Sequence, residues 1–276
     1  MGLWLSLLLL SGGALGGLVD NVVGMGFGAI SATVMLGGGI APVVAVATVN
    51  LAKVGDGALA SLSHWRLGNV RWAWALPLAL AGVVGGVAGA LLLVHLPAQF
   101  IRLAMPALLL ATGFLILYRF RPFGSLPAVS GGSGAALAAP SASGRWRPAL
   151  ALPGPLGLRL AGIGGLAGLL NAVSGVFGPF ATAGVVLMDR SHPRYAVGTV
   201  NLAEFFVASA VSITLFWQVG LGELRWGLAV PLLVGSAIGA PVGAYLSRRL
   251  PARVLGILLG LALVALNAWS LLRALN

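Results

Sequence analysis

The residues best suited to chemistry lie in two copies of one polar motif, each inside an apolar stretch. The sequence "ATVNLAK" covers residues 47–53, and "GTVNLAE" covers residues 198–204. A polar side chain in hydrocarbon needs a hydrogen-bond partner or a water-filled cavity. The repeated motif therefore predicts either a substrate-binding lining or hydrogen bonds between helices. The residues concerned are Thr48, Asn50, Thr199 and Asn201.

The two copies end on opposite charges, Lys53 and Glu204. An ionisable residue within a membrane span is costly and points first to function. Lys53 could attract an anion and Glu204 could take up a proton, but the two could also form a structural ion pair, or Lys53 could snorkel. Asp56 is a further candidate for proton coupling, and because it follows Lys53 at i+3 it could instead pair with it locally.

A second duplicated pattern sets an Asn between two short apolar pieces, followed by Gly and Phe. Glycine lowers helix stability and permits close backbone approach. The pattern predicts a broken or re-entrant helix pair in each half, with the Asn at its turn and free backbone amides that attract an anion. The competing interpretation is that the glycines only allow tight helix packing. The candidate residues are Asn21, Gly26, Phe27 and Gly28 in the first half and Asn171, Phe177 and Gly178 in the second.

The composition indicates which class of protein must position these residues. Of 276 residues, 59% are hydrophobic and 8% are charged, whereas a soluble domain carries about a quarter charged residues. Several apolar runs exceed the length of about 18 residues that marks a membrane span. The sequence therefore predicts an all-α polytopic membrane protein, because only helices or closed barrels satisfy the backbone in lipid.

Several functional classes are disfavoured by what the sequence lacks. The net charge of +11 comes from basic residues that lie mostly between apolar runs, which favours topology control and contact with anionic lipid over nucleic-acid binding. There is no cysteine, and the three histidines are scattered without metal-ligand spacing. No phosphate-binding loop is present. We expect no cofactor, no metal site and no enzymatic activity.

The apolar segments form two matching sets of five. They are expected at 3–19, 22–36, 41–65, 72–95 and 98–118, and at 157–170, 172–188, 195–218, 226–247 and 251–272. Identities recur in order, including Arg71-Trp72 with Arg225-Trp226, which indicates a duplicated unit. Small residues four apart at 82–90 and 235–244 predict close helix packing. The predicted domains are a first transmembrane repeat at 1–120, a flexible linker at 121–155 and a second repeat at 156–276.

The arginines predict how the repeats are oriented. If the first segment pair of each half dips into the membrane and returns, twelve arginines share one side and only Arg102, Arg225 and Arg273 fall on the other. That asymmetry is the one expected for a cytoplasmic side. Each repeat would then hold one short helix pair and three transmembrane helices. The repeats would be inverted, with both termini outside a bacterial inner membrane and the linker in the cytoplasm. Inverted repeats are typical of secondary transporters, whose substrate site lies near the midplane.

The sequence resembles one family of membrane transporters over both halves. The stretches "GMGFGAISATVMLGGGIAPV" and "LGNVRWAWALPLALAGVVGGVAGALL", with the Thr/Asn motif between them, are similar to the sulfite exporter TauE/SafE family. The stretch "GELRWGLAVPLLVGSAIGAPVGAYLSRRLP" repeats the pattern, although the second glycine cluster is reduced to "SGVFGPF". By position, the resemblance implies a site formed by Gly26, Phe27, Gly28, Thr48 and Asn50, with Phe177, Gly178, Thr199 and Asn201 opposite.

The resemblance implies a small sulfur-containing anion, sulfite or an organosulfonate, as the substrate. We therefore expect a secondary transporter that works by alternating access, with proton coupling as a hypothesis. An anion channel of the same architecture is the main alternative, while an intramembrane enzyme and a lipid scramblase are less favoured. The expected partners are the anion and the lipid bilayer. The sequence leaves the oligomeric state open.

Overall fold

The computed structural model describes residues 3–23, 25–66, 68–120, 154–188, 193–219, 226–246 and 252–275. All regular structure in these ranges is helical, which confirms the predicted all-α class. The first five helices are α1 (Leu3–Val23), α2 (Phe27–Gly37), α3 (Pro42–Arg66), α4 (Trp72–Leu93) and α5 (Ala98–Arg119). The next five are α6 (Pro155–Ser174), α7 (Gly178–Met188), α8 (Pro193–Val219), α9 (Trp226–Leu246) and α10 (Ala252–Leu275). The linker expected at 121–155 lies outside the described residues except for its last two.

Most of these helices are suited to a bilayer. By length and composition, seven of them within the described ranges can cross a membrane, namely α1, α3, α4, α5, α6, α8 and α10. Large apolar side chains such as Leu158 and Trp217 are exposed on the outside of the bundle, as expected where lipid rather than water is the surrounding solvent. The chain is therefore a multi-pass membrane protein.

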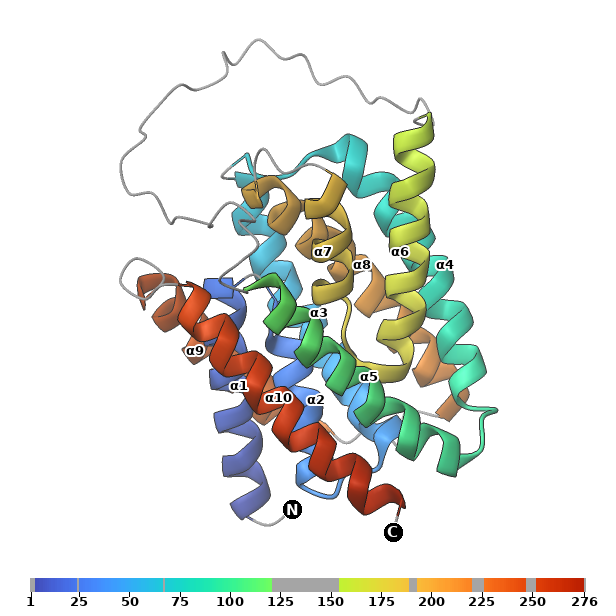
Figure 1. Cartoon of the computed structure of the whole chain (residues 1–276), viewed down its shortest axis with the longest axis vertical. Coiled ribbons are helices and arrows are strands. Elements are labelled where there is room, and N and C mark those ends of the chain that lie inside the picture. Colours follow the sequence, from blue (N-terminus) through green and yellow to red (C-terminus); the bar gives the residue numbers. More distant parts are fainter. Residues whose placement is uncertain are drawn as a thin grey trace.

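The predicted break between the first two segments is present in both halves (Figure 1). The pairs are not short, however, because the first helix of each, α1 or α6, is by itself long and apolar enough to cross a membrane. After α1 the chain turns and the short helix α2 packs back against it, and α7 packs in the same way against α6. The turns fall later than predicted. Asn21 and Asn171 lie in the last turns of α1 and α6 rather than at the turns themselves. Helix α6 ends at Ser174, and the next residue, Gly175, adopts φ 73° and donates its N–H to the carbonyl of Asn171 at 2.7 Å.

Helices of the first half pack mainly on helices of the second. Helix α1 lies against α9 and α4 against α6, while α3 packs on α8 and α5 on α10. The helix backbones approach most closely at glycines, as predicted from the small residues four apart at 82–90 and 235–244. A Cβ atom on Gly239 would collide with the carbonyl oxygen of Ala14, and one on Gly85 would collide with that of Gly165. The absence of a side chain is thus needed to bring two backbones together.

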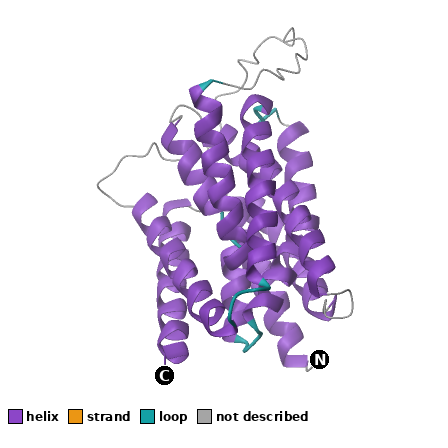
Figure 2. Ribbon diagram, turned by 90° about the vertical axis from the view of Figure 1, so that its right-hand side faces the viewer, coloured by secondary structure: helices purple, strands orange, loops and turns teal. Residues whose placement is uncertain are grey.

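The directions of the helices place both ends of the chain together. Figures 1 and 2 show the N-terminus and the C-terminus at the same end of the bundle. Helix α1 runs away from that end, whereas α6 begins at the opposite end and runs back toward it (Figure 1). The turns that follow α1 and α6 consequently meet inside the bundle.

Candidate functional site

The two helix breaks touch each other in the middle of the bundle. Gly28, in the first turn of α2, lies so close to the carbonyl oxygen of Gly175 that any Cβ atom there would collide with it. The same Cβ would stand 2.8 Å from the Nζ atom of Lys53. The amino end of α2, the end of α6 and Lys53 of α3 therefore meet at one point. The glycine requirement at position 28 follows from this crowding rather than from backbone conformation.

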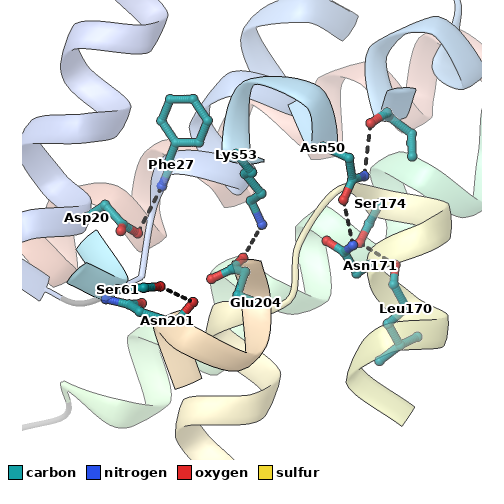
Figure 3. A network of polar contacts seen from close by, with 11 residues as sticks. Asp20, Phe27, Asn50, Lys53, Ser61, Leu170, Asn171, Ser174, Asn201 and Glu204 are labelled. Atoms are coloured by element: carbon teal, nitrogen blue, oxygen red, sulfur yellow. Dashed lines mark hydrogen bonds and ion pairs between the residues drawn. The ribbon is translucent and has the colours of Figure 1, made fainter. Parts of the chain in front are cut away.

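An ion pair joins the two halves at this point (Figure 3). The Nζ atom of Lys53 donates to Oε1 of Glu204. The side chains are 7% and 16% exposed, so the pair is largely shielded from solvent. The alternative local pair between Lys53 and Asp56 is not formed, because Asp56 instead accepts a hydrogen bond from the hydroxyl of Ser236 on α9. The equivalent ends of the two polar motifs are thus in direct contact across the α3–α8 interface.

Internal carboxylates stand at the amino ends of both half-helices. Oδ1 of Asp20 accepts a hydrogen bond of 3.2 Å from the N–H of Phe27 (Figure 3). Oε2 of Glu204 lies 3.4 Å from where a Cβ atom on Gly178 would stand. Free amides were expected at these ends, so the expectation is wrong for Phe27, whose N–H is already bound. A helix amino end carries partial positive charge, and here this charge faces carboxylates of the protein itself.

The Asn residues of the two halves form a second polar contact beside the ion pair (Figure 3). Nδ2 of Asn171 donates to Oδ1 of Asn50 at 2.7 Å, and Nδ2 of Asn50 donates to the carbonyl of Val46 at 2.9 Å. Both side chains are fully buried. Oδ1 of Asn171 has no hydrogen-bond partner among the described residues. A buried acceptor of this kind is rare and calls for a ligand or an ordered water as its partner.

The two Thr residues of the motifs do not join this centre. The hydroxyl of Thr48 donates to the carbonyl of Val44 one turn earlier, at 2.7 Å. The hydroxyl of Thr199 accepts a bond of 3.0 Å from the N–H of Arg71, ahead of α4. Their place in the substrate lining therefore stays a prediction. Phe177 is fully buried in the apolar core, and the Asn21 side chain lies outside what the structure describes.

The charged side chains of the site line one small cavity. Its volume is about 20 Å³, room for about one water molecule. The lining consists of Asp20, Phe27, Lys53, Asp56, Gly57, Ala60, Asn201 and Glu204. Asn201 is 9% exposed, and its side chain makes no hydrogen bond with the described residues, whereas its backbone carbonyl accepts one from the hydroxyl of Ser61. The cavity thus offers an amide with free donors and acceptors beside the Lys53–Glu204 pair.

The charges of the cavity are unbalanced. Three carboxylates and one ammonium group line it, which leaves a formal charge of −2 when all four are ionised. The two half-helix amino ends offset part of this, about half a charge each. Within the described ranges, no group of three or more His, Cys, Asp or Glu side chains is arranged to hold a metal ion. The cavity thus places three groups that can take up a proton around one cation.

Sequence reasoning missed one cation near the breaks. Nη1 of Arg119, in the last turn of α5, donates to the sulfur of Met25 at 3.2 Å. Met25 in turn lies beside Gly178 at the amino end of α7. A thioether is a weak acceptor, and the guanidinium has no carboxylate partner among the described residues. The sequence marks Arg119 only as a basic residue at a helix end, so its place next to the breaks comes from the fold.

Comparison with known proteins gives one family and two relatives. The family described as "Sulfite exporter TauE/SafE" matches residues 9–269. The chain is 29% identical over 263 residues to "Probable membrane transporter protein YtnM" of Bacillus subtilis (strain 168), which covers 94% of this chain and 80% of that protein. A shorter match, 36% identical over 95 residues, joins 34% of the chain to 36% of "Probable membrane transporter protein ORF9" of Sinorhizobium sp. No solved structure matches the chain.

Proposed function

Because the chain belongs to the sulfite exporter TauE/SafE family, we propose that it is a secondary transporter that carries a small sulfur-containing anion across the bacterial inner membrane. Sulfite and the organosulfonates are the candidate substrates. The carrier would work by alternating access, without enzymatic activity and without a cofactor. Both relatives are described as probable membrane transporters, which supports transport but leaves the substrate to be tested.

The observation that carries the proposal is the position of Lys53. This residue supplies the ammonium group of the central cavity, at the contact between the two halves and beside the amino end of α2. A lysine within a membrane span is retained where it has a charged partner. Glu204 is that partner in this conformation. A sulfonate or sulfite group could replace the carboxylate, since each presents negatively charged oxygens to the same donors.

Proton coupling follows from the charge of the cavity. A monovalent anion that enters the cavity while all its carboxylates are ionised would make the formal charge more negative, from −2 to −3. Removing one partner from a buried ion pair costs about 3–5 kcal/mol, because the other charge is left uncompensated. A proton on Glu204 would release Lys53 for the anion and neutralise the displaced carboxylate at once. Glu204 is therefore the first candidate for the coupling residue, and Asp56 and Asp20 are the next acids in reach.

The arrangement of the helices supports alternating access between two inverted repeats. The two halves make equivalent contacts: α1 packs on α9, and α6, the counterpart of α1, packs on α4, the counterpart of α9. In Figure 1, α1 and α6 run in opposite directions. The ion pair lies where α3 and α8 meet, so rocking of one half against the other would open it to each side in turn. The common location of the two termini fits the predicted topology, in which both lie outside and the linker lies in the cytoplasm.

Arg119 would meet the anion before Lys53 does. It lies in the last turn of α5, on the predicted cytoplasmic side. It contacts Met25, Met25 lies beside Gly178, and Gly178 lies beside Glu204. An anion that approached along these residues would first meet a guanidinium whose contacts among the described residues are the thioether of Met25 and the ring of Phe120. We assign Arg119 the role of drawing the anion toward the breaks.

A binding screen tests the proposed function. Purified protein is heated with sulfite, sulfate, thiosulfate or sulfoacetate, with sodium chloride at equal ionic strength as the reference. At ten times its Kd a ligand stabilises the folded state by about 1.4 kcal/mol, so at least one sulfur anion should raise Tm in the native protein and not in Lys53→Met. If none does so, or if the variant responds equally, the proposal fails. Flux into proteoliposomes that does not saturate would favour the channel alternative.

A further inference from the structure

A second and much larger hollow lies away from the central cavity. This groove has a volume of about 720 Å³ and shares no lining residue with the cavity. It runs between the end of α2, the start of α3, the first turns of α5 and the last turns of α10, next to the C-terminus. Its size is that of a binding site for an organic ligand. Most of the lining is apolar, including Val43, Ile101 and Leu266.

Among the described residues, two arginines and no acidic residue line this groove. Arg102 belongs to the first turns of α5 and Arg273 to the last turn of α10, and both are exposed. The guanidinium of Arg273 lies over the ring of Trp269, 4.9 Å from its centroid, and both residues line the groove. Leu266 and Trp269 are themselves 53% and 57% exposed, so the apolar wall continues onto the outer surface of the bundle.

The predicted topology gives no reason for arginines at this place. Only three arginines fall on the predicted outer side, Arg102, Arg225 and Arg273, where the positive-inside rule disfavours them. Two of the three nevertheless line the same groove. A ligand that satisfies the groove must present an anionic group to the arginines and an apolar chain to the wall. A free inorganic anion would leave the apolar wall without a partner, and an uncharged apolar chain would leave the two arginines without one.

We propose that this groove binds an anionic phospholipid. The phosphate group would accept hydrogen bonds from Arg102 and Arg273, since guanidinium groups match phosphate oxygens in pairs of hydrogen bonds. One acyl chain would lie along the apolar wall between α5 and α10, and Trp269 would stand at the headgroup level, as tryptophan does at membrane interfaces. The site is separate from the proposed transport site and does not depend on the transported substrate.

Native mass spectrometry of the delipidated full chain tests this site. The protein is titrated with phosphatidylglycerol or with phosphatidylcholine of the same acyl chains. The native protein should hold phosphatidylglycerol in preference to phosphatidylcholine. The double variant Arg102→Gln/Arg273→Gln should bind phosphatidylglycerol about 30-fold more weakly, because each arginine near an anionic lipid contributes about fivefold. Its affinity for phosphatidylcholine should be unchanged.

A matched control variant and a competition with inorganic phosphate complete the test. Arg159 and Arg253 are exposed arginines that do not line the groove, so Arg159→Gln/Arg253→Gln is the control and should bind both lipids like the native protein. Equal retention of the two lipids by the native protein, or an equal loss in the control variant, would overturn the proposal. Displacement of phosphatidylglycerol by millimolar inorganic phosphate would also overturn it, since the ligand would then be a free anion.

Discussion

The Lys53–Glu204 pair allows a sharp test of how the two halves are held together. The variants are Lys53→Met, Glu204→Gln and the double substitution. In Glu204→Gln, Lys53 keeps Asp20 and Asp56 nearby, so the cost should lie near the lower limit for a broken buried pair, about 3 kcal/mol. In Lys53→Met, three carboxylates face one another without a cation, so the cost should approach the upper limit, about 5 kcal/mol.

The double variant removes both charges of the pair and should cost less than the sum of the single variants. We expect a coupling energy of at least about 2 kcal/mol. Unfolding in mixed micelles with rising dodecyl sulfate, followed through the fluorescence of the eight tryptophans, measures each variant. Glu223→Gln, at a residue between predicted apolar segments, is the control and should stay within about 0.5 kcal/mol of the native protein. Additive single effects would show that the pair does not couple α3 to α8.

Three further substitutions test other parts of the site. Gly28→Ala should lower the free energy of unfolding by about 1–3 kcal/mol and abolish uptake of the anion, because its Cβ would collide with the backbone of Gly175. The control is Gly162→Ala, where a Cβ meets no atom within 4 Å, and it should be neutral or stabilising in the same unfolding assay. Asp20→Asn keeps an acceptor for the backbone and removes one negative charge, so the anion should bind about tenfold more tightly by titration calorimetry; unchanged or weaker binding would contradict the charge argument. Arg119→Gln should raise the KM for uptake by roughly tenfold or more with little change in Tm, and an unchanged KM would remove Arg119 from the path.

The helices were predictable because their signal is local. The ten apolar segments expected from the sequence each overlap one of the ten helices in the described residues, although the breaks had been expected at Asn21 and Asn171. The exact ends of α1 and α6 were not predictable. The helices continue past Asn21 and Asn171, and for α6 a single left-handed residue, Gly175, makes the turn. Sequence alone does not say which of several neighbouring glycines adopts that conformation.

The charged part of the site was predictable for a different reason. Lys53 and Glu204 occupy equivalent places in a duplicated motif, so an approach between α3 and α8 brings them together. The hydrogen bond of Thr48 to its own backbone one turn earlier was not predicted, and its place in the substrate lining stays a prediction. Arg119 and Ser236 were missed because their contacts come from α5 and α9, and nothing in the local sequence marks them. The role of Asp20 likewise depends on where Phe27 begins α2.

Proton movement during anion uptake tests the central claim most directly. Proteoliposomes that contain a pH-sensitive dye are exposed to a sulfonate, which has no neutral form at neutral pH and so cannot carry protons through the lipid by itself. The native protein should acidify the lumen in step with saturable sulfonate uptake, while Glu204→Gln should lose the coupled acidification. Sulfonate uptake without proton movement, or acidification that persists in Glu204→Gln, would contradict the account.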